Sequence, residues 1–303
     1  MGTYGVGLYA NDFAADLKGT IRAVSRLPFD AGRLAEIVVE FERASATNPG
    51  DEDYSTFWLV LADQFWRQGI TSKLVNERAL AIIDSGADLD MQRRRGQKEP
   101  GLRARARVLT ELQARLTTPP PDKKRSVLRF AQPYVMEIGD AIIYPTCGGH
   151  PRNPYATDPN QLKIYGPGSG RPWFHDGWGA MVIVDRGRAF GFFVWYRPLI
   201  VHPVLGREEP DISTLEQAPW SVEVAGTCTR LHFRRMEMRK IGAFTIGPEK
   251  RNEALPGLAT GARQATGDIS IANRMHVRPR PTTVKHLREP YGRTIHLSDL
   301  RGS

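Results

Sequence analysis

The sequence predicts an α+β protein in which an N-terminal helical bundle precedes a small antiparallel β-barrel-like or curled-sheet domain. Apolar residues recur at helical spacing as far as residue 116, three prolines follow at 119–121, and the segments beyond are short and rich in β-branched and aromatic residues. The predicted organisation is a helical domain over 1–118, a proline-rich linker over 119–124, a β-rich domain over 125–250 and an irregular basic C-terminal extension over 251–303.

The helical domain is predicted from start signals that each precede an apolar stripe. Short polar or acidic residues that favour a helix N-terminus stand at Asn11 or Asp12, Asp30, Asp51 or Asp53, and Thr71 or Ser72. A last helix is expected over about 102–116. Short connections between such helices are typical of antiparallel hairpins in a bundle.

The β-rich domain is predicted from four segments, which read AIIYPT, GAMVIVDRGRAFGFFVWYRP, WSVEVAG and RLHFRRMEM. The second contains a hairpin, with strands over 179–184 and 188–196 and a turn over 185–187. Bulky residues alternate on both faces of 188–196, so we expect this strand to be central and buried on both sides.

The positive charge of the chain lies in two blocks. The formal net charge is +9, and it divides into −6 over 1–90, +9 over 91–130, −3 over 131–227 and +9 over 228–303. Clustered positive charge attracts polyanions or acidic protein surfaces. The alternative is that both blocks are solvated linker and tail.

Cysteine content and hydropathy indicate a cytoplasmic protein with no membrane partner. Two cysteines make a disulfide-built extracellular domain improbable. The longest apolar stretches have the length of a strand and do not reach that of a membrane span, and the first residues do not have the pattern of a secretory signal.

Arginines before and within the last predicted helix form the first candidate binding surface, at Arg93, Arg94, Arg95, Arg103 and Arg107. Arginine neutralises phosphate, so contact with a nucleic acid is one interpretation. No helix-turn-helix spacing, zinc-finger spacing or RNP-type aromatic strand accompanies them. A solvated basic face is the alternative.

A loop over 163–179 combines glycine and proline with aromatic residues and is the second candidate surface. Trp173, His175 and Trp178 are its candidate ligand-binding residues, because binding residues concentrate on such loops. The alternative is that both tryptophans are buried as packing. The GPGSG portion lacks the Lys-Ser/Thr pair of a phosphate-binding P-loop.

Cysteine and histidine residues of the β-rich domain form a candidate zinc set, consisting of Cys147, His150, Cys228 and His232. Two thiolates and two imidazoles are a possible tetrahedral donor set. The long interval between the two halves is unusual for a zinc finger, and the alternative is a glycine turn with a buried thiol. No other cofactor is indicated.

The first of these cysteines is also a candidate nucleophile. Gly148 and Gly149 could offer backbone N–H groups beside Cys147, with His175 or His232 as the base. Such chemistry requires a lowered thiol pKa and an oriented histidine.

The opening of the chain resembles a bacterial family of domains of unknown function. Its pattern M-G-x-[WY]-G-x-G-x-x-x-N-D-x-x-x-D is met by Met1, Gly2, Tyr4, Gly5, Gly7, Asn11, Asp12 and Asp16. The resemblance extends over 57–89, implies a cytoplasmic bacterial protein, and assigns no catalytic residue. Some relatives belong with toxin–immunity or defence proteins, so the resemblance also implies a role of that kind.

Together these features predict a non-enzymatic interaction protein that engages a protein or a nucleic acid. The alternative is a hydrolase or zinc-dependent enzyme that uses the cysteine and histidine residues of the β-rich domain.

Overall fold

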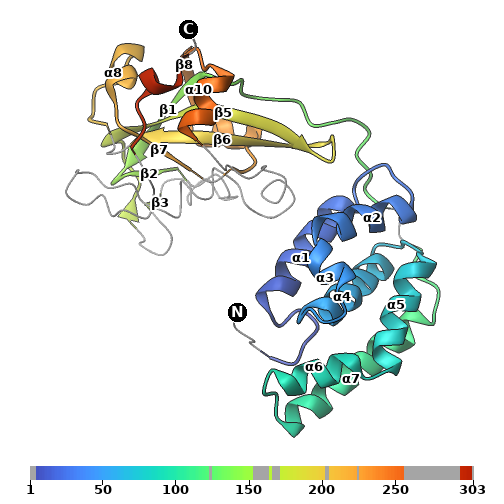
Figure 1. Cartoon of the computed structure of the whole chain (residues 1–303). Coiled ribbons are helices and arrows are strands. Elements are labelled where there is room, and N and C mark those ends of the chain that lie inside the picture. Colours follow the sequence, from blue (N-terminus) through green and yellow to red (C-terminus); the bar gives the residue numbers. More distant parts are fainter. Residues whose placement is uncertain are drawn as a thin grey trace. The chain divides into compact units, whose positions relative to one another are not determined.

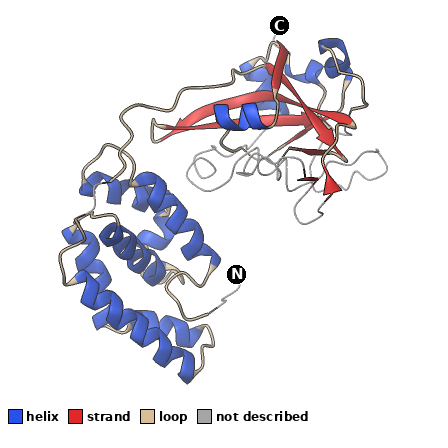
Figure 2. Ribbon diagram, turned by 180° about the vertical axis from the view of Figure 1, so that it is seen from behind, coloured by secondary structure: helices blue, strands red, loops and turns tan. Residues whose placement is uncertain are grey.

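The computed structural model describes residues 5–122, 125–152, 164–165, 171–201, 205–223, 225–255 and 294–301. The chain divides into two compact units, Met1–Phe130 and Ala131–Ser303 (Figure 1). The first is helical and the second is built on an antiparallel sheet, so the predicted α+β class is confirmed (Figure 2).

The helical unit contains the following helices among its described residues: α1 (Asp12–Val24), α2 (Ala31–Phe41), α3 (Arg43–Thr47), α4 (Tyr54–Arg67), α5 (Lys73–Asp84), α6 (Ala87–Arg94) and α7 (Glu99–Leu116). Three predicted caps form. The Asn11 side chain accepts from the Ala14 N–H, and Asp30 and Ser72 begin α2 and α5 in the same way.

Two helices, α3 and α6, were not expected from the sequence. Helix α6 follows α5 after only Ser85 and Gly86, and Gly86 adopts the left-handed conformation with a φ of 71°. A Ser-Gly pair is typical of a helix end, and here the same pair also leads into the next helix.

Residues beyond the proline run still belong to the helical unit. The Leu128 N–H donates to the Arg26 carbonyl oxygen at 2.8 Å, and the Arg125 guanidinium donates to the Phe29 carbonyl oxygen at 3.0 Å. These contacts bind 125–130 to the end of α1 and to the connection that follows it.

The second unit is a curled half-barrel. Its strands are β1 (Asp140–Cys147), β2 (His150–Pro151), β5 (Gly177–Ala189), β6 (Phe193–Val201), β7 (Trp220–Val222) and β8 (Arg239–Ala243), with β3 (Ile164–Tyr165) and β4 (Arg171–Pro172) paired separately. The main sheet has the order β2-β1-β5-β6-β7, and β8 also pairs with β1. The short helices are α8 (Ile212–Gln217), α9 (Arg230–Arg235), α10 (Pro248–Ala254) and the 3₁₀ helix η3 (Leu297–Leu300).

Each face of the sheet carries its own hydrophobic core. Ala141 and Ile143 of β1 pack with residues of α8 and η3, whereas Ile142 and Tyr144 pack on the opposite face with Met236 and Met238 around α9. Figure 1 shows α8, α10 and η3 on one side of the sheet. Burial on both faces explains why the strands are continuously apolar.

The β5–β6 hairpin was predicted, but its turn lies elsewhere than expected. The strands continue through 185–187, and the chain reverses at Phe190 and Gly191, which have φ values of 52° and 76°. The glycine at 187 serves packing instead, because a Cβ there would lie 2.6 Å from the ring of Trp195.

The segment RLHFRRMEM was expected to be a strand, and most of it is helix α9. Thr229 caps this helix through a capping box with His232. Six residues of helix are too few to display a helical period, so the aromatic and basic residues looked like a strand.

The end of the chain returns to the sheet. Ile295 forms an antiparallel bridge with Trp220, and Leu297 and Leu300 are buried in the same core. The Gly247 N–H before α10 donates to the Leu300 carbonyl oxygen at 2.8 Å. Residues 256–293, the larger part of the predicted C-terminal extension, lie outside the described residues.

Candidate ligand-binding groove

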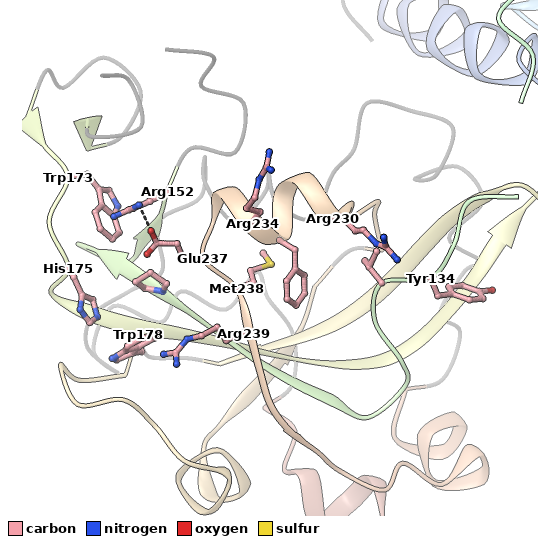
Figure 3. A pocket seen from close by; sticks show the side chains of 13 residues that line it. Tyr134, Arg152, Trp173, His175, Trp178, Arg230, Arg234, Glu237, Met238 and Arg239 are labelled. Atoms are coloured by element: carbon pink, nitrogen blue, oxygen red, sulfur yellow. Dashed lines mark hydrogen bonds and ion pairs between the residues drawn. The ribbon is translucent and has the colours of Figure 1, made fainter. Parts of the chain in front are cut away.

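The sheet unit contains a groove with a volume of about 800 Å³ beside β1 and α9. Its lining combines cationic and ring-bearing side chains with a few apolar ones: Tyr134, Val135, Pro145, Arg152, Trp173, His175, Trp178, Arg230, Phe233, Arg234, Glu237, Met238 and Arg239 (Figure 3). Four arginines and one glutamate make this lining strongly basic.

Helix α9 supplies the cationic wall of the groove. Arg230 and Arg234 are one helical turn apart and therefore lie on the same face, with Phe233 next to them. The capping box holds the helix start, since the Thr229 N–H donates to Nδ1 of His232 at 3.4 Å. Burial and the nearby Arg235 lower the pKa of His232, which favours the neutral ring that this hydrogen bond requires.

Arginine side chains stack on the rings at both ends of the groove. The guanidinium of Arg152 lies 4.5 Å from the centre of the Trp173 ring, and that of Arg239 lies 5.2 Å from Trp178. At the other end, marked by Arg230 and Tyr134 in Figure 3, two arginines of β5 lie about 4 Å from the Tyr134 ring.

Two of the four groove arginines are engaged by carboxylates. Arg152 pairs with Glu237 inside the groove (Figure 3), and Arg239 pairs with Glu209 at 2.6 Å. Within the described part of the chain, Arg230 and Arg234 make no ion pair, and both are exposed. These two side chains are therefore available to an anionic ligand.

The three residues predicted from the aromatic loop all line the groove. His175 is exposed and makes an edge contact with Trp178, their ring centres 4.8 Å apart. Trp178 is also part of a hydrophobic core, and its Nε1–H donates to the Arg207 carbonyl oxygen at 3.2 Å. Trp178 thus packs in the core, as one interpretation expected, and also lines the groove; binding of a ligand by Trp178 stays a prediction. Residues 166–170 of the loop lie outside the described residues.

The predicted zinc set does not assemble. In the described residues, which include all four candidates, no group of three or more His, Cys, Asp and Glu side chains is arranged to hold a metal ion. Cys147 ends β1 next to His150 of β2, whereas Cys228 is buried in the core beneath α9. Burial raises the pKa of the Cys228 thiol to about 12, and His232 is committed to its helix cap.

The predicted nucleophile is also not activated. Burial raises the pKa of the Cys147 thiol, and the Asp176 carboxylate raises it further. The backbone N–H of Gly148 donates to that carboxylate at 2.8 Å, so it is engaged inside the protein. The predicted roles of Cys147, and of Gly148 as a donor to an oxyanion, are thus not supported by the geometry.

Part of the basic block at the end of the helical unit is neutralised within that unit. Arg95, predicted to bind a partner, instead pairs with the buried Asp53 at 3.0 Å, and Arg93 pairs with Asp90 at 2.7 Å. The remaining predicted binding residues of this block are exposed: Arg94, Arg103 and Arg107.

Other arginines of α7 also pair with acidic residues of the same unit. Arg105 makes two hydrogen bonds to Asp88, and Arg115 lies 3.0 Å from the buried carboxylate of Asp63. The acidic first 90 residues and the basic stretch after them are therefore partly matched within one unit.

Sequence analysis did not identify the four groove arginines as binding residues. Arg230, Arg234 and Arg239 belong to the second basic block, which was recognised only as a charge excess. Arg152 has no basic neighbours in the sequence, so no charge cluster indicated a binding residue there. The segment RLHFRRMEMRK does carry a signal, because its arginines are spaced four apart around an aromatic residue.

Comparisons with protein-family models, curated proteins and solved structures found no match. Among the described residues, no helix is both long enough and apolar enough to cross a membrane.

Proposed function

We propose that the sheet unit binds single-stranded nucleic acid in its groove and that the protein acts through binding rather than catalysis. The observation that carries this proposal is the combination of four arginines with the rings of Tyr134, Trp173, Trp178 and Phe233 in one groove. Phosphates attract arginine, and unpaired bases stack on aromatic rings, so single-stranded nucleic acid satisfies both kinds of side chain.

The charges in the groove support an anionic ligand. Arg230 and Arg234 are exposed on one face of α9 and make no ion pair with other described residues. Arg239 is held beside the Trp178 ring, where a backbone phosphate and a stacked base would lie close together.

An acidic protein segment is the competing ligand. Such a segment would satisfy the arginines through its carboxylates, but carboxylates do not stack on aromatic rings such as those of Trp173 and Trp178. The rings therefore favour a nucleic acid. A bacterial origin and a role in immunity or defence remain predictions from the opening motif.

The direct test is a fluorescence anisotropy titration at low salt. The probes are labelled single-stranded RNA and DNA of mixed sequence, the matching duplexes, and a glutamate-rich peptide. The double variant R230Q/R234Q should bind the single strands at least about tenfold more weakly, since each lost charged hydrogen bond costs roughly 1.5–3 kcal/mol.

The matched control is R103Q/R107Q, which removes the same charge from exposed positions of the helical unit. It should retain the affinity of the unaltered protein. The proposal is overturned if the peptide binds more tightly than the oligonucleotides, or if the control variant loses as much affinity as the groove variant.

A further inference from the structure

Glu237 is an unusual residue for a groove that binds phosphates. Among the described residues that line the groove it is the one carboxylate, in a lining that also contains four arginines. A carboxylate repels phosphate, so it weakens general binding of a polyanion. Its side chain is half exposed and forms an ion pair with Arg152 in the groove (Figure 3).

The backbone of Glu237 adopts a conformation that normally favours glycine. Its φ is 53°, in the left-handed region. It occupies the position just beyond α9 in a Schellman motif, in which the Met238 N–H donates to the Phe233 carbonyl oxygen at 2.9 Å. A side chain at such a position costs about 1–2 kcal/mol relative to the right-handed conformation.

The cost and the repulsion together point to a role for the carboxylate in recognition. Strained residues cluster at ligand sites, where the surrounding structure holds them in place. Replacing Glu237 by glycine would relieve both penalties. Its presence in the groove is explained if a ligand offers hydrogen-bond donors to it.

We propose that Glu237 makes the groove selective for guanine, an inference that rests on the proposed binding of single-stranded nucleic acid. Guanine carries two adjacent donors, N1–H and the 2-amino group, which match the two oxygens of one carboxylate. Adenine and cytosine each offer one amino group on that edge, and the uracil N–H lies between two acceptors. Guanine is therefore the base that a carboxylate distinguishes best.

The side chains around Glu237 are suited to such a base. An ionised carboxylate has about four acceptor positions, so the ion pair with Arg152 orients Glu237 and still leaves it able to accept from a base. The ring of Trp173 lies at the same end of the groove for stacking (Figure 3). Its Nε1–H is buried and has no hydrogen-bond partner among the described residues.

The test compares short labelled oligouridylates that differ at one central position. That position holds guanine, inosine, adenine or uracil, and inosine differs from guanosine in lacking the 2-amino group. We expect guanine to be preferred over uracil and adenine by at least about tenfold, because hydrogen bonds to a charged group contribute roughly 1.5–3 kcal/mol. Inosine should bind with intermediate affinity.

The variants E237Q and E237G should reduce the preference for guanine over uracil to nearly one. E237G also removes the backbone strain, so it keeps the test valid if E237Q proves unstable. The matched control E249Q removes an exposed carboxylate of α10 and should leave the preference intact.

Two failures can be told apart. If the unaltered protein binds all four oligonucleotides equally through Arg230 and Arg234, guanine selectivity is wrong and the proposed function stands. If it binds none of them at low salt, the proposed function itself is wrong, and the proposed selectivity for guanine is then wrong as well.

Discussion

Replacing Arg105 by methionine should lower the free energy of unfolding of the helical unit by about 3–5 kcal/mol, because the substitution leaves a carboxylate buried without its partner. The side chains of Arg105 and Asp88 are 4% and 1% exposed, respectively. Their two hydrogen bonds measure 2.8 and 2.9 Å. Substituting either partner of a pair so deeply buried should therefore lower the free energy of unfolding strongly.

Arg105 also holds the N-terminal arm, which comprises the described residues 5–11 before α1. Its Nη1 donates to the Gly7 carbonyl oxygen at 2.9 Å and to that of Val6 at 3.3 Å. Losing these two bonds contributes roughly 1–3 kcal/mol, at about 0.5–1.5 kcal/mol each. The D88L substitution should cost about as much as R105M because it strands the guanidinium, but it leaves the bonds to the arm in place.

The double variant R105M/D88L separates these contributions. It contains no buried charge at either position, so it should cost only the roughly 1–3 kcal/mol of the arm contacts, less than the sum of the single variants. The assay is urea unfolding of the full chain followed by circular dichroism at 222 nm, where the helical unit dominates the signal. If the double variant costs the sum of the single ones, the two residues do not interact and the reasoning is refuted.

Three further predictions concern the sheet unit. Cys147 should react slowly with a maleimide at pH 8 until denaturant is added, because burial raises the pKa of its thiol. Mass spectrometry measures the labelling, and rapid labelling of the native protein would contradict the prediction. Hydrogen bonds from the first turn of α8 lower the pKa of Asp211 to about 2. Because this folded value lies below the unfolded value of about 3.9, its stabilisation is present above pH 4 and lost as the pH falls toward 2. D211N should therefore reduce the acid sensitivity of the urea midpoint, and an unchanged pH profile would refute this. A Cβ at Gly179 would lie 2.2 Å from the Tyr144 ring, so G179A should lower the free energy of unfolding in urea by about 1–3 kcal/mol. The control G206A, which has open space around the added Cβ, should change the free energy of unfolding little. Equal effects of the two variants would contradict the packing argument.

The parts of the fold that depend on local chemistry were predictable from sequence. Asn11, Asp30 and Ser72 cap helices because a short polar side chain can reach backbone N–H groups only a few residues away. The change from helical to strand patterning across the proline run likewise needs no knowledge of distant contacts.

Features set by distant contacts were not predictable. The glycine at 187 resembled a turn residue, but it is required by the Trp195 ring across the hairpin, and the turn formed at Phe190 instead. Arg95 resembled a binding residue because its partner, Asp53, lies 42 residues earlier in the sequence. Charge alone does not indicate whether an arginine faces solvent or a carboxylate of the same unit.

The candidate site was predictable only in part for the same reason. Trp173, His175 and Trp178 were identified because they share one loop. Arg152 and the α9 arginines join them through pairing of the strands, which no local pattern shows. The four cysteine and histidine residues resembled a zinc site in sequence, yet Cys147 and Cys228 occupy different surroundings in the sheet unit.

Binding of single-stranded nucleic acid through the groove arginines is tested most directly by the salt dependence of the affinity. Each phosphate contact with a single strand contributes about −0.7 to the slope of log K against log salt. Two to four contacts predict a slope of roughly −1.4 to −2.8, and R230Q/R234Q should reduce its magnitude by about 1.4. An affinity that does not depend on salt, or a slope that is the same in the variant, would contradict binding at this groove.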